Sequence, residues 1–150
     1  MTTVSHLLQW IEEFAPRRLA ETWDNVGLLW GDPAGPVTRL MTCLTVTAET
    51  ADEAIAAGAQ LIVSHHPVLF RAVKQVRADH RETGVLWRLA RAGVSIISPH
   101  TLLGLIQLGK GGRRTEFREF NRLKRAIRRA RQHLANGNLQ SAKRVTHGAA

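Results

Sequence analysis

Between residues 39 and 100, short apolar segments alternate with segments of helical pattern, and this order constrains the fold most. The expected elements, in chain order, are a strand at 39–46, a helix at 48–58, a strand at 60–66, a helix at 79–92 and a strand at 94–100. Both expected helices are closed by a glycine, Gly58 and Gly93. Strands and helices that alternate in this way build a parallel sheet with right-handed crossovers. We therefore expect an α/β fold with a mostly parallel sheet and flanking helices.

The segment before these elements is predicted to hold one helix and then a loop. Thr3 is a candidate N-cap of this helix, and Pro16 is a stop signal. The apolar residues at helical spacing between them are Val4, Leu7, Leu8, Ile11 and Phe14. The sequence WDNVGLLWGD, at 23–32, is interpreted as a loop.

The charge is divided unevenly along the chain. Residues 1–101 carry 9 Lys and Arg against 10 Asp and Glu, whereas residues 102–150 carry 12 against 2, so the net charge of +9 comes from the last third. We interpret this as an α/β half-domain at 1–101 and a basic helical tail at 102–150. Within the tail, residues 116–135 are predicted to form an amphipathic helix with a cationic polar face. Such a helix could bind nucleic acid, an acidic membrane surface or a partner, or dock on the domain.

Composition indicates a globular protein of the cytoplasm. The chain has 150 residues, of which 44% are hydrophobic, enough for one domain with a core. Cys43 is the only cysteine, so no internal disulfide can form, and its apolar neighbours predict a buried thiol. The sequence contains neither a signal-peptide pattern nor an apolar run of about 18 residues, the length that a membrane helix needs. We therefore expect no association with a membrane.

Two adjacent histidines, His65 and His66, stand at the carboxyl end of the expected strand 60–66, and Pro67 follows at once. His100 ends the next expected strand, and ligands in open α/β sheets bind outside the carboxyl ends of the strands, so one rim is expected to carry all three imidazoles. Pro67 holds His66 extended where the chain must bend, and diverging imidazoles would suit two metal ions about 3.5–4 Å apart. The alternative is that one histidine is hydrogen-bonded in the core while its neighbour is solvated.

A hydrolytic site with two metal ions also needs carboxylates, which bridge the cations and orient a water molecule. Asp24 and Asp32, both from the segment 23–32, are the available candidates. For Asp24 a structural role is an equally good interpretation, in which its side chain orders the turn through hydrogen bonds. No carboxylate follows directly after His100.

Three blocks of the sequence carry a family likeness. LAETWDNVGLLWGD, GAQLIVSHHPVLF and GVSIISPHT resemble, in order and spacing, blocks of the Nif-three-like family. Its members are also known as GTP cyclohydrolase I type 2 homologues, or dinuclear metal centre hexameric proteins. The resemblance runs from about Val4 to Thr101, and the combination of WDNVGL with a later SHHP is much more specific than either motif alone.

The resemblance implies an α/β fold, assembly into a toroidal hexamer and two divalent cations at the strand ends. It further implies that His65 and His66 are metal ligands. Zn, Fe, Mn, Ni and Co all accept imidazole nitrogen, so the residue type does not select among these metals. The intact relatives look like metal-dependent hydrolases, in which the metals lower the pKa of a bound water toward neutrality.

The sequence departs from the family pattern shortly after Thr101. The family continues His-Thr-x-x-Asp with the aspartate as a ligand, whereas this chain has HTLLG and therefore Gly104 at that position. A later His-x-x-x-Glu motif does not occur, so at most two of the five expected ligands are present. We expect a truncated or frame-shifted member with weak metal binding and little catalysis, and translation of the encoding DNA in all frames tests this expectation. The alternative function is a non-enzymatic scaffold, or a module that binds nucleic acid or a partner through its cationic helix.

Overall fold

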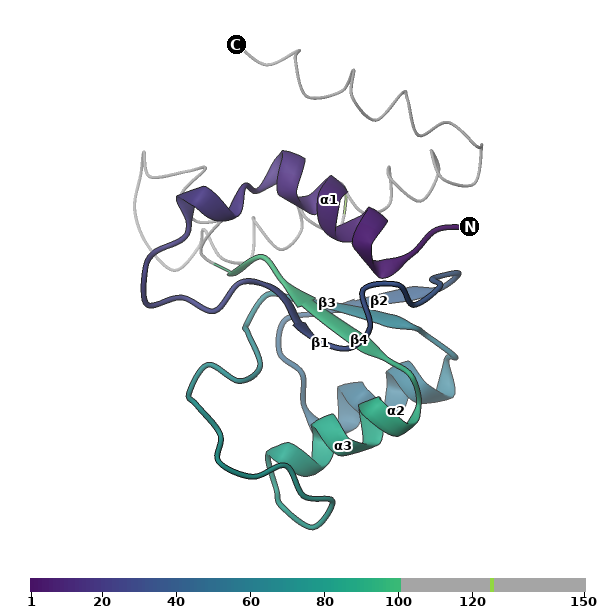
Figure 1. The fold of residues 1–150 in the computed structure, drawn as a ribbon. Helices are drawn as coiled ribbons and strands as arrows, with labels where there is room; N and C mark the ends of the chain where they lie inside the picture. The colour runs from purple at the N-terminus through teal and green to yellow at the C-terminus, as the bar shows by residue number, and fades with distance from the viewer. Residues whose placement is uncertain (101–124, 126–150) are drawn as a thin grey trace.

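The computed structural model describes residues 1–100 and Arg125. Its helices and strands, in chain order, are α1 (Val4–Phe14), the 3-10 turn η1 (Arg17–Leu19), β1 (Gly27–Trp30), β2 (Leu40–Cys43), α2 (Ala48–Ala56), β3 (Leu61–Ser64), α3 (Thr83–Arg91) and β4 (Ser95–Ser98). The strands form a four-stranded sheet in the order β1-β4-β3-β2 (Figure 1). The basic helix predicted at 116–135 lies, except for Arg125, outside the described residues.

The sheet is mostly parallel, as the sequence predicts. β2 pairs with β3, and β3 pairs with β4, both in parallel. Helices α2 and α3 provide the two crossovers between these strands. Each of the three predicted strands is present, although each is confined to four residues within its predicted range. The predicted α/β class with flanking helices is therefore confirmed.

One strand of the sheet corrects the sequence interpretation. Residues 27–30, expected to be part of a loop, form β1, which pairs antiparallel with β4 and places Gly27 opposite Ser98. Four residues are too few to show a period, and the partner strand is distant in the chain, so no local pattern identifies β1. Gly31 ends the strand at φ 109°, where a Cβ atom would lie 2.7 Å from the Ser95 Cα. Only glycine therefore allows this close passage beside β4.

Helices cover both faces of the sheet, with α1 on one face and the α2–α3 pair on the other (Figure 1). Alternation along β3 assigns its side chains to the two layers, because successive residues of a strand point to opposite faces. Leu61 and Val63 pack with α1, and Ile62 packs with α2 and α3. Cys43 belongs to the second layer, where the predicted burial is confirmed and raises the pKa of its thiol to about 11.

The helix starts follow from local hydrogen bonds. Thr3 caps α1 as predicted, because its Oγ1 accepts a hydrogen bond from the backbone N–H of His6 at 3.4 Å. Thr47 caps α2 in the same way, through a capping box with Thr50. Helix α3 begins four residues later than the predicted start at 79, since the chain before it forms a turn in which the His80 carbonyl accepts from the N–H of Gly84.

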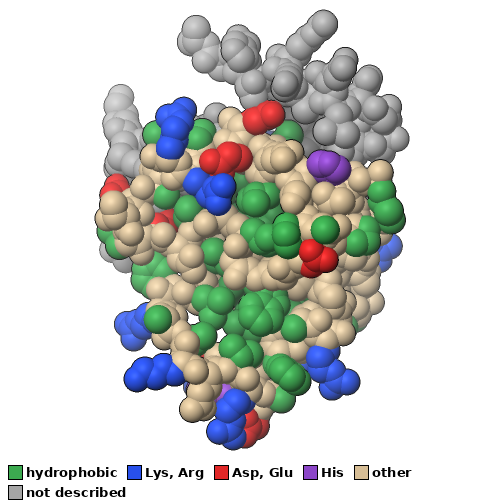
Figure 2. Space-filling model, in the orientation of Figure 1, with side chains coloured by type: hydrophobic (Ala, Val, Ile, Leu, Met, Phe, Trp, Pro, Cys, Tyr) green, Lys and Arg blue, Asp and Glu red, His purple; other side chains and the backbone are tan. Residues whose placement is uncertain are grey.

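The described surface has a mixed charge. Figure 2 shows Lys and Arg side chains scattered toward the edges of one face, with hydrophobic and acidic side chains between them. This distribution agrees with the near balance of charges in residues 1–101. Among the described helices, none combines the length and apolar character needed to cross a membrane.

Candidate metal centre

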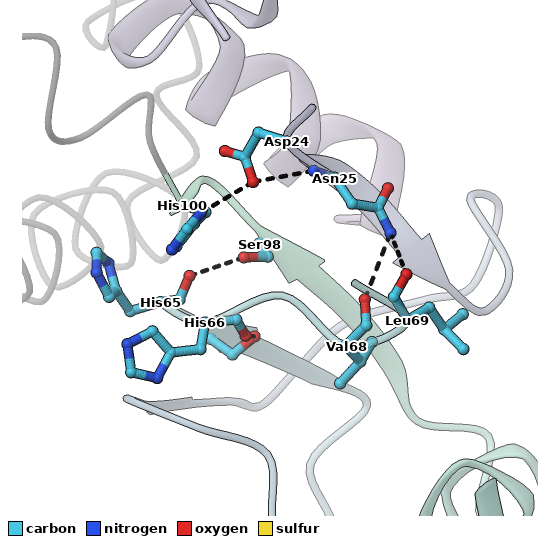
Figure 3. A network of polar contacts seen from close by, with 9 residues as sticks. Asp24, Asn25, His65, His66, Val68, Leu69, Ser98 and His100 are labelled. Carbon is cyan, nitrogen blue, oxygen red and sulfur yellow. Dashed lines mark hydrogen bonds and ion pairs between the residues drawn. The ribbon is translucent and has the colours of Figure 1, made fainter. Parts of the chain in front are cut away.

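Three imidazoles lie together where β3 and β4 end. His65 and His66 directly follow β3, and His100 lies two residues beyond β4. Because these strands are parallel neighbours, their carboxyl ends share one edge of the sheet. The ring centroids of His65 lie 5.1 Å from His66 and 5.4 Å from His100, and those of His66 and His100 are 6.1 Å apart. The convergence predicted from topology is therefore observed (Figure 3).

The backbone of the histidine pair is held by an extension of the β2–β3 pairing. The N–H of His65 donates to the Cys43 carbonyl at 3.1 Å, and the N–H of His66 donates to the Leu44 carbonyl at 2.8 Å. His65 is buried, with 4% of its surface exposed, whereas His66 is half-buried. The Nδ1 of His66 lies 2.7 Å from the Thr45 Oγ1. Because this hydrogen bond occupies Nδ1, the Nε2 of His66 is the ring nitrogen that could bind a metal ion.

Two buried serines support the histidines from behind. Ser98 donates a hydrogen bond from its Oγ to the His65 carbonyl at 2.9 Å, and Ser64 donates to the His66 carbonyl at the same distance. Neither serine side chain is accessible to solvent. The sequence interpretation did not identify these residues, although each stands at the last position of a strand that leads to a histidine. Their hydroxyls fix the direction in which the chain leaves the sheet.

Asp24 reaches the same rim from the segment before β1. One carboxylate oxygen, Oδ1, accepts hydrogen bonds from the N–H of Asn25 and from the Nδ1 of His100, both at 2.9 Å (Figure 3). The Asp24 side chain is fully buried, and that of His100 is 23% exposed. The turn-ordering role that the sequence left open is thus observed, and the carboxylate also orients a histidine of the cluster. This bond directs the Nε2 of His100 away from Asp24.

Asp32 lies beside the amino end of β4, at the opposite end of the strands from the histidines. It follows β1, which runs antiparallel to β4, so the chain reaches Asp32 beside the beginning of β4 rather than its end. The backbone N–H of Asp32 donates a hydrogen bond to the Oγ of Ser95, the first residue of β4, at 3.3 Å. The Asp32 Oδ1 accepts from the N–H of Ala34 at 2.8 Å, which closes a surface turn. Asp32 therefore does not join the histidines.

The loop after Pro67 is tied to the segment that carries Asp24. The side-chain amide of Asn25 donates to the carbonyls of Val68, at 3.4 Å, and Leu69, at 3.1 Å (Figure 3). Leu69 has φ 55°, in the left-handed region that costs a branched side chain roughly 1 kcal/mol or more. Asn25 thus holds a strained turn directly beside the histidine rim.

The described residues include candidates for only part of the ligand set that a metal site needs. Among residues 1–100, no group of three or more His, Cys, Asp or Glu side chains is arranged to hold an ion. The imidazoles of His65 and His66 have the donor chemistry for divalent transition metals, and the Thr45 contact orients one of them. The two residues therefore fit as one part of a ligand set, and their metal-binding role stays a prediction. Position 104, where the resemblance expects a carboxylate, lies outside the described residues.

Comparison with known families identifies the chain. Residues 2–110 match Duf34/NIF3 (NGG1p interacting factor 3). The chain belongs to the DUF34/NIF3 family. Proteins called GTP cyclohydrolase 1 type 2 homolog are similar to this member, with 37% identity over 100 residues in Staphylococcus aureus (strain MRSA252) and 35% over 106 residues in Clostridium acetobutylicum. These matches cover 67% and 71% of this chain, but only 27% and 40% of the two relatives.

Solved NIF3-type structures share the fold of the described part. A hypothetical protein of Staphylococcus aureus matches with a TM-score of 0.65 at 36% identity, over 67% of this chain and 29% of that one. A Bacillus cereus protein related to NIF3 matches with a TM-score of 0.65 at 29% identity, over 69% of this chain and 28% of that one. The family membership and the α/β fold expected from the sequence are therefore confirmed. This DUF34/NIF3 chain spans between about a quarter and two fifths of the length of the curated relatives it matches.

Proposed function

We propose that this DUF34/NIF3 chain binds divalent transition-metal cations through His65 and His66. The observation that carries the proposal is the convergence of three imidazoles at the carboxyl ends of parallel strands, with ring centroids 5.1–6.1 Å apart. This edge is where α/β sheets bind ligands, and neutral imidazole is a ligand for Zn, Fe, Mn, Ni and Co.

The surrounding residues limit the movement of this pair. Backbone pairing to β2 and the hydroxyls of Ser64 and Ser98 restrain both histidines. Thr45 further fixes the imidazole of His66 through its Nδ1. A restrained ligand loses less conformational entropy when it binds, so these contacts favour metal binding. A cation held there would supply Lewis acidity for hydrolysis, which is the reaction class that we propose for the family site.

The small number of ligands sets the expected strength of binding. With two of the five ligands that the resemblance implies, we expect weaker metal binding than in the longer relatives and little hydrolysis. Assembly into a homo-oligomer and a cytoplasmic location are also proposed. A single buried cysteine, Cys43, suits a reducing compartment. Sedimentation velocity of the purified chain tests the assembly, for which the resemblance predicts a hexamer.

Metal titration of the full chain tests the binding proposal. Wild type and a His65→Ala, His66→Ala double variant are stripped with a chelator, dialysed and titrated with Zn²⁺ or Mn²⁺ by calorimetry, and bound metal is then measured by elemental analysis. His80→Ala is the matched control, because His80 is exposed and lies before α3 rather than at the rim. We expect wild type and the control to bind alike, and the double variant to lose at least tenfold in affinity. Equal binding by all the proteins would overturn the proposal.

A further inference from the structure

Two large aromatic side chains stand exposed next to the histidines. Trp23 is 59% exposed and Phe70 is 52% exposed, although both are residues that folding normally buries. Their ring centroids lie 6.2 Å apart with an angle of 75° between the ring planes. The ring of Phe70 also lies 6.5 Å from that of His100. The aromatic pair and the histidine cluster therefore form one continuous run of rings.

Each residue of this aromatic pair is next in the chain to a residue that other contacts hold in place. Trp23 precedes Asp24, whose buried carboxylate is bonded to His100. Phe70 follows Leu69, whose left-handed backbone is held by the amide of Asn25. Backbone strain of this kind persists only where surrounding contacts enforce it, and it is concentrated at ligand sites. Both aromatic residues are thus attached to segments that other residues fix in place.

The geometry of the pair selects a class of ligand. Two rings whose planes meet at 75° each present a face to the corner between them. A planar ring in that corner can stack on one side chain and meet the other edge to face, and both arrangements are favourable for aromatic rings. Stacking on an exposed aromatic side chain is also how proteins bind heterocyclic bases without a complete pocket. An aliphatic or purely polar molecule would gain neither contact.

We propose that Trp23 and Phe70 form a subsite for a planar heteroaromatic ring, which holds one end of a molecule while its other end lies at the histidine cluster. This inference rests on the proposed function, since it describes the substrate class of that same site. The run from Phe70 to His100 connects the subsite to the rim. The substrate class is therefore a small molecule that contains a heterocycle and carries its reactive group within reach of the histidines.

Binding of nucleosides to the full chain tests the subsite. Adenosine and uridine are the ring-bearing probes and ribose is the ring-free probe, and saturation-transfer NMR measures contact and affinity. We expect contact at the base protons of both nucleosides and none with ribose. Trp23→Ala and Phe70→Ala should each weaken nucleoside binding severalfold, and the double variant at least tenfold. Trp23→Phe should retain most of the affinity because it keeps an aromatic face.

The control variant is Trp87→Ala, because Trp87 is 43% exposed and lies on α3, which covers the face of the sheet opposite α1. It should bind nucleosides like wild type. Nucleoside binding that is absent in wild type, or unchanged in the Trp23 and Phe70 variants, would overturn the proposal. So would a change in oligomeric mass of these variants without a change in nucleoside binding, since the rings would then serve contact between copies.

Metal titration of the same samples separates this inference from the proposed function. The Trp23 and Phe70 variants should bind Zn²⁺ like wild type, because neither residue is a proposed ligand. The His65→Ala, His66→Ala variant should lose metal binding and keep contact with the base protons. If wild type binds no metal but still binds nucleosides through Trp23 and Phe70, the metal proposal fails and the aromatic subsite stands.

Discussion

The contact between Asp24 and His100 allows a quantitative test of how burial strengthens a polar interaction at this rim. The Oδ1 of Asp24 and the Nδ1 of His100 are 2.9 Å apart, and the aspartate side chain is fully buried. Hydrogen bonds that involve a charged group contribute about 1.5–3 kcal/mol when they are shielded from water. With His100 still 23% exposed, we expect a coupling free energy toward the lower end, about 1.5–2 kcal/mol.

A double-mutant cycle measures this coupling. Asp24→Ala, His100→Ala and the combined variant are unfolded in urea at 25 °C and pH 7, and tryptophan fluorescence follows the transition. Asp24→Ala also deprives the N–H of Asn25 of its acceptor, but this cost occurs in both backgrounds and cancels in the cycle. The coupling free energy therefore reports the contact between the two side chains rather than the whole effect of either substitution.

The ion pair between Asp52 and Arg88 is the control cycle. Its atoms are 2.6 Å apart, closer than those of Asp24 and His100, but its side chains are 59% and 42% exposed. Exposed ion pairs of this kind contribute about 0.2–1 kcal/mol. We expect the buried contact to give the larger coupling despite its longer distance. A coupling between Asp24 and His100 no greater than that of the control would refute the reasoning from burial.

Further predictions concern three residues of the fold. Gly31→Ala should lower the free energy of unfolding by about 2 kcal/mol or more, because φ is 109° and the added Cβ meets Ser95; an unchanged urea midpoint would contradict this. Thr47→Ala should cost about 1 kcal/mol through loss of the α2 cap, whereas Thr47→Ser should cost less. Cys43, with a pKa of about 11 against 9.0 unperturbed, should react about 100-fold more slowly with Ellman's reagent at pH 8 when folded than in urea. Because the folded thiol keeps its proton to higher pH, stability should also fall as the pH rises above 9, and a flat profile there would contradict its burial.

Local sequence patterns were enough to predict the parallel core and the positions of the histidines at its rim. The segments that form β2, β3 and β4 are short and apolar, and the segments between them carry helical patterns, so the order of elements is local information. Once those strands are parallel neighbours, the residues after β3 and β4 must share an edge. His65 and His66 directly follow β3 and His100 lies two residues beyond β4, so their convergence could be predicted from the order of the elements.

Which other residues join the histidines depends on contacts between segments that are distant in the chain. The pairing of β1 with β4 is non-local, and its antiparallel direction brings Asp24 to the rim and takes Asp32 to the opposite end of the strands. Both aspartates lie in one ten-residue segment of the sequence, so no local pattern could separate them. The approach of Trp23 to Phe70 has the same origin, because it depends on how two segments cross in space. Local periodicity specifies strands and their ends, whereas the register and direction of an edge strand depend on packing against the assembled sheet.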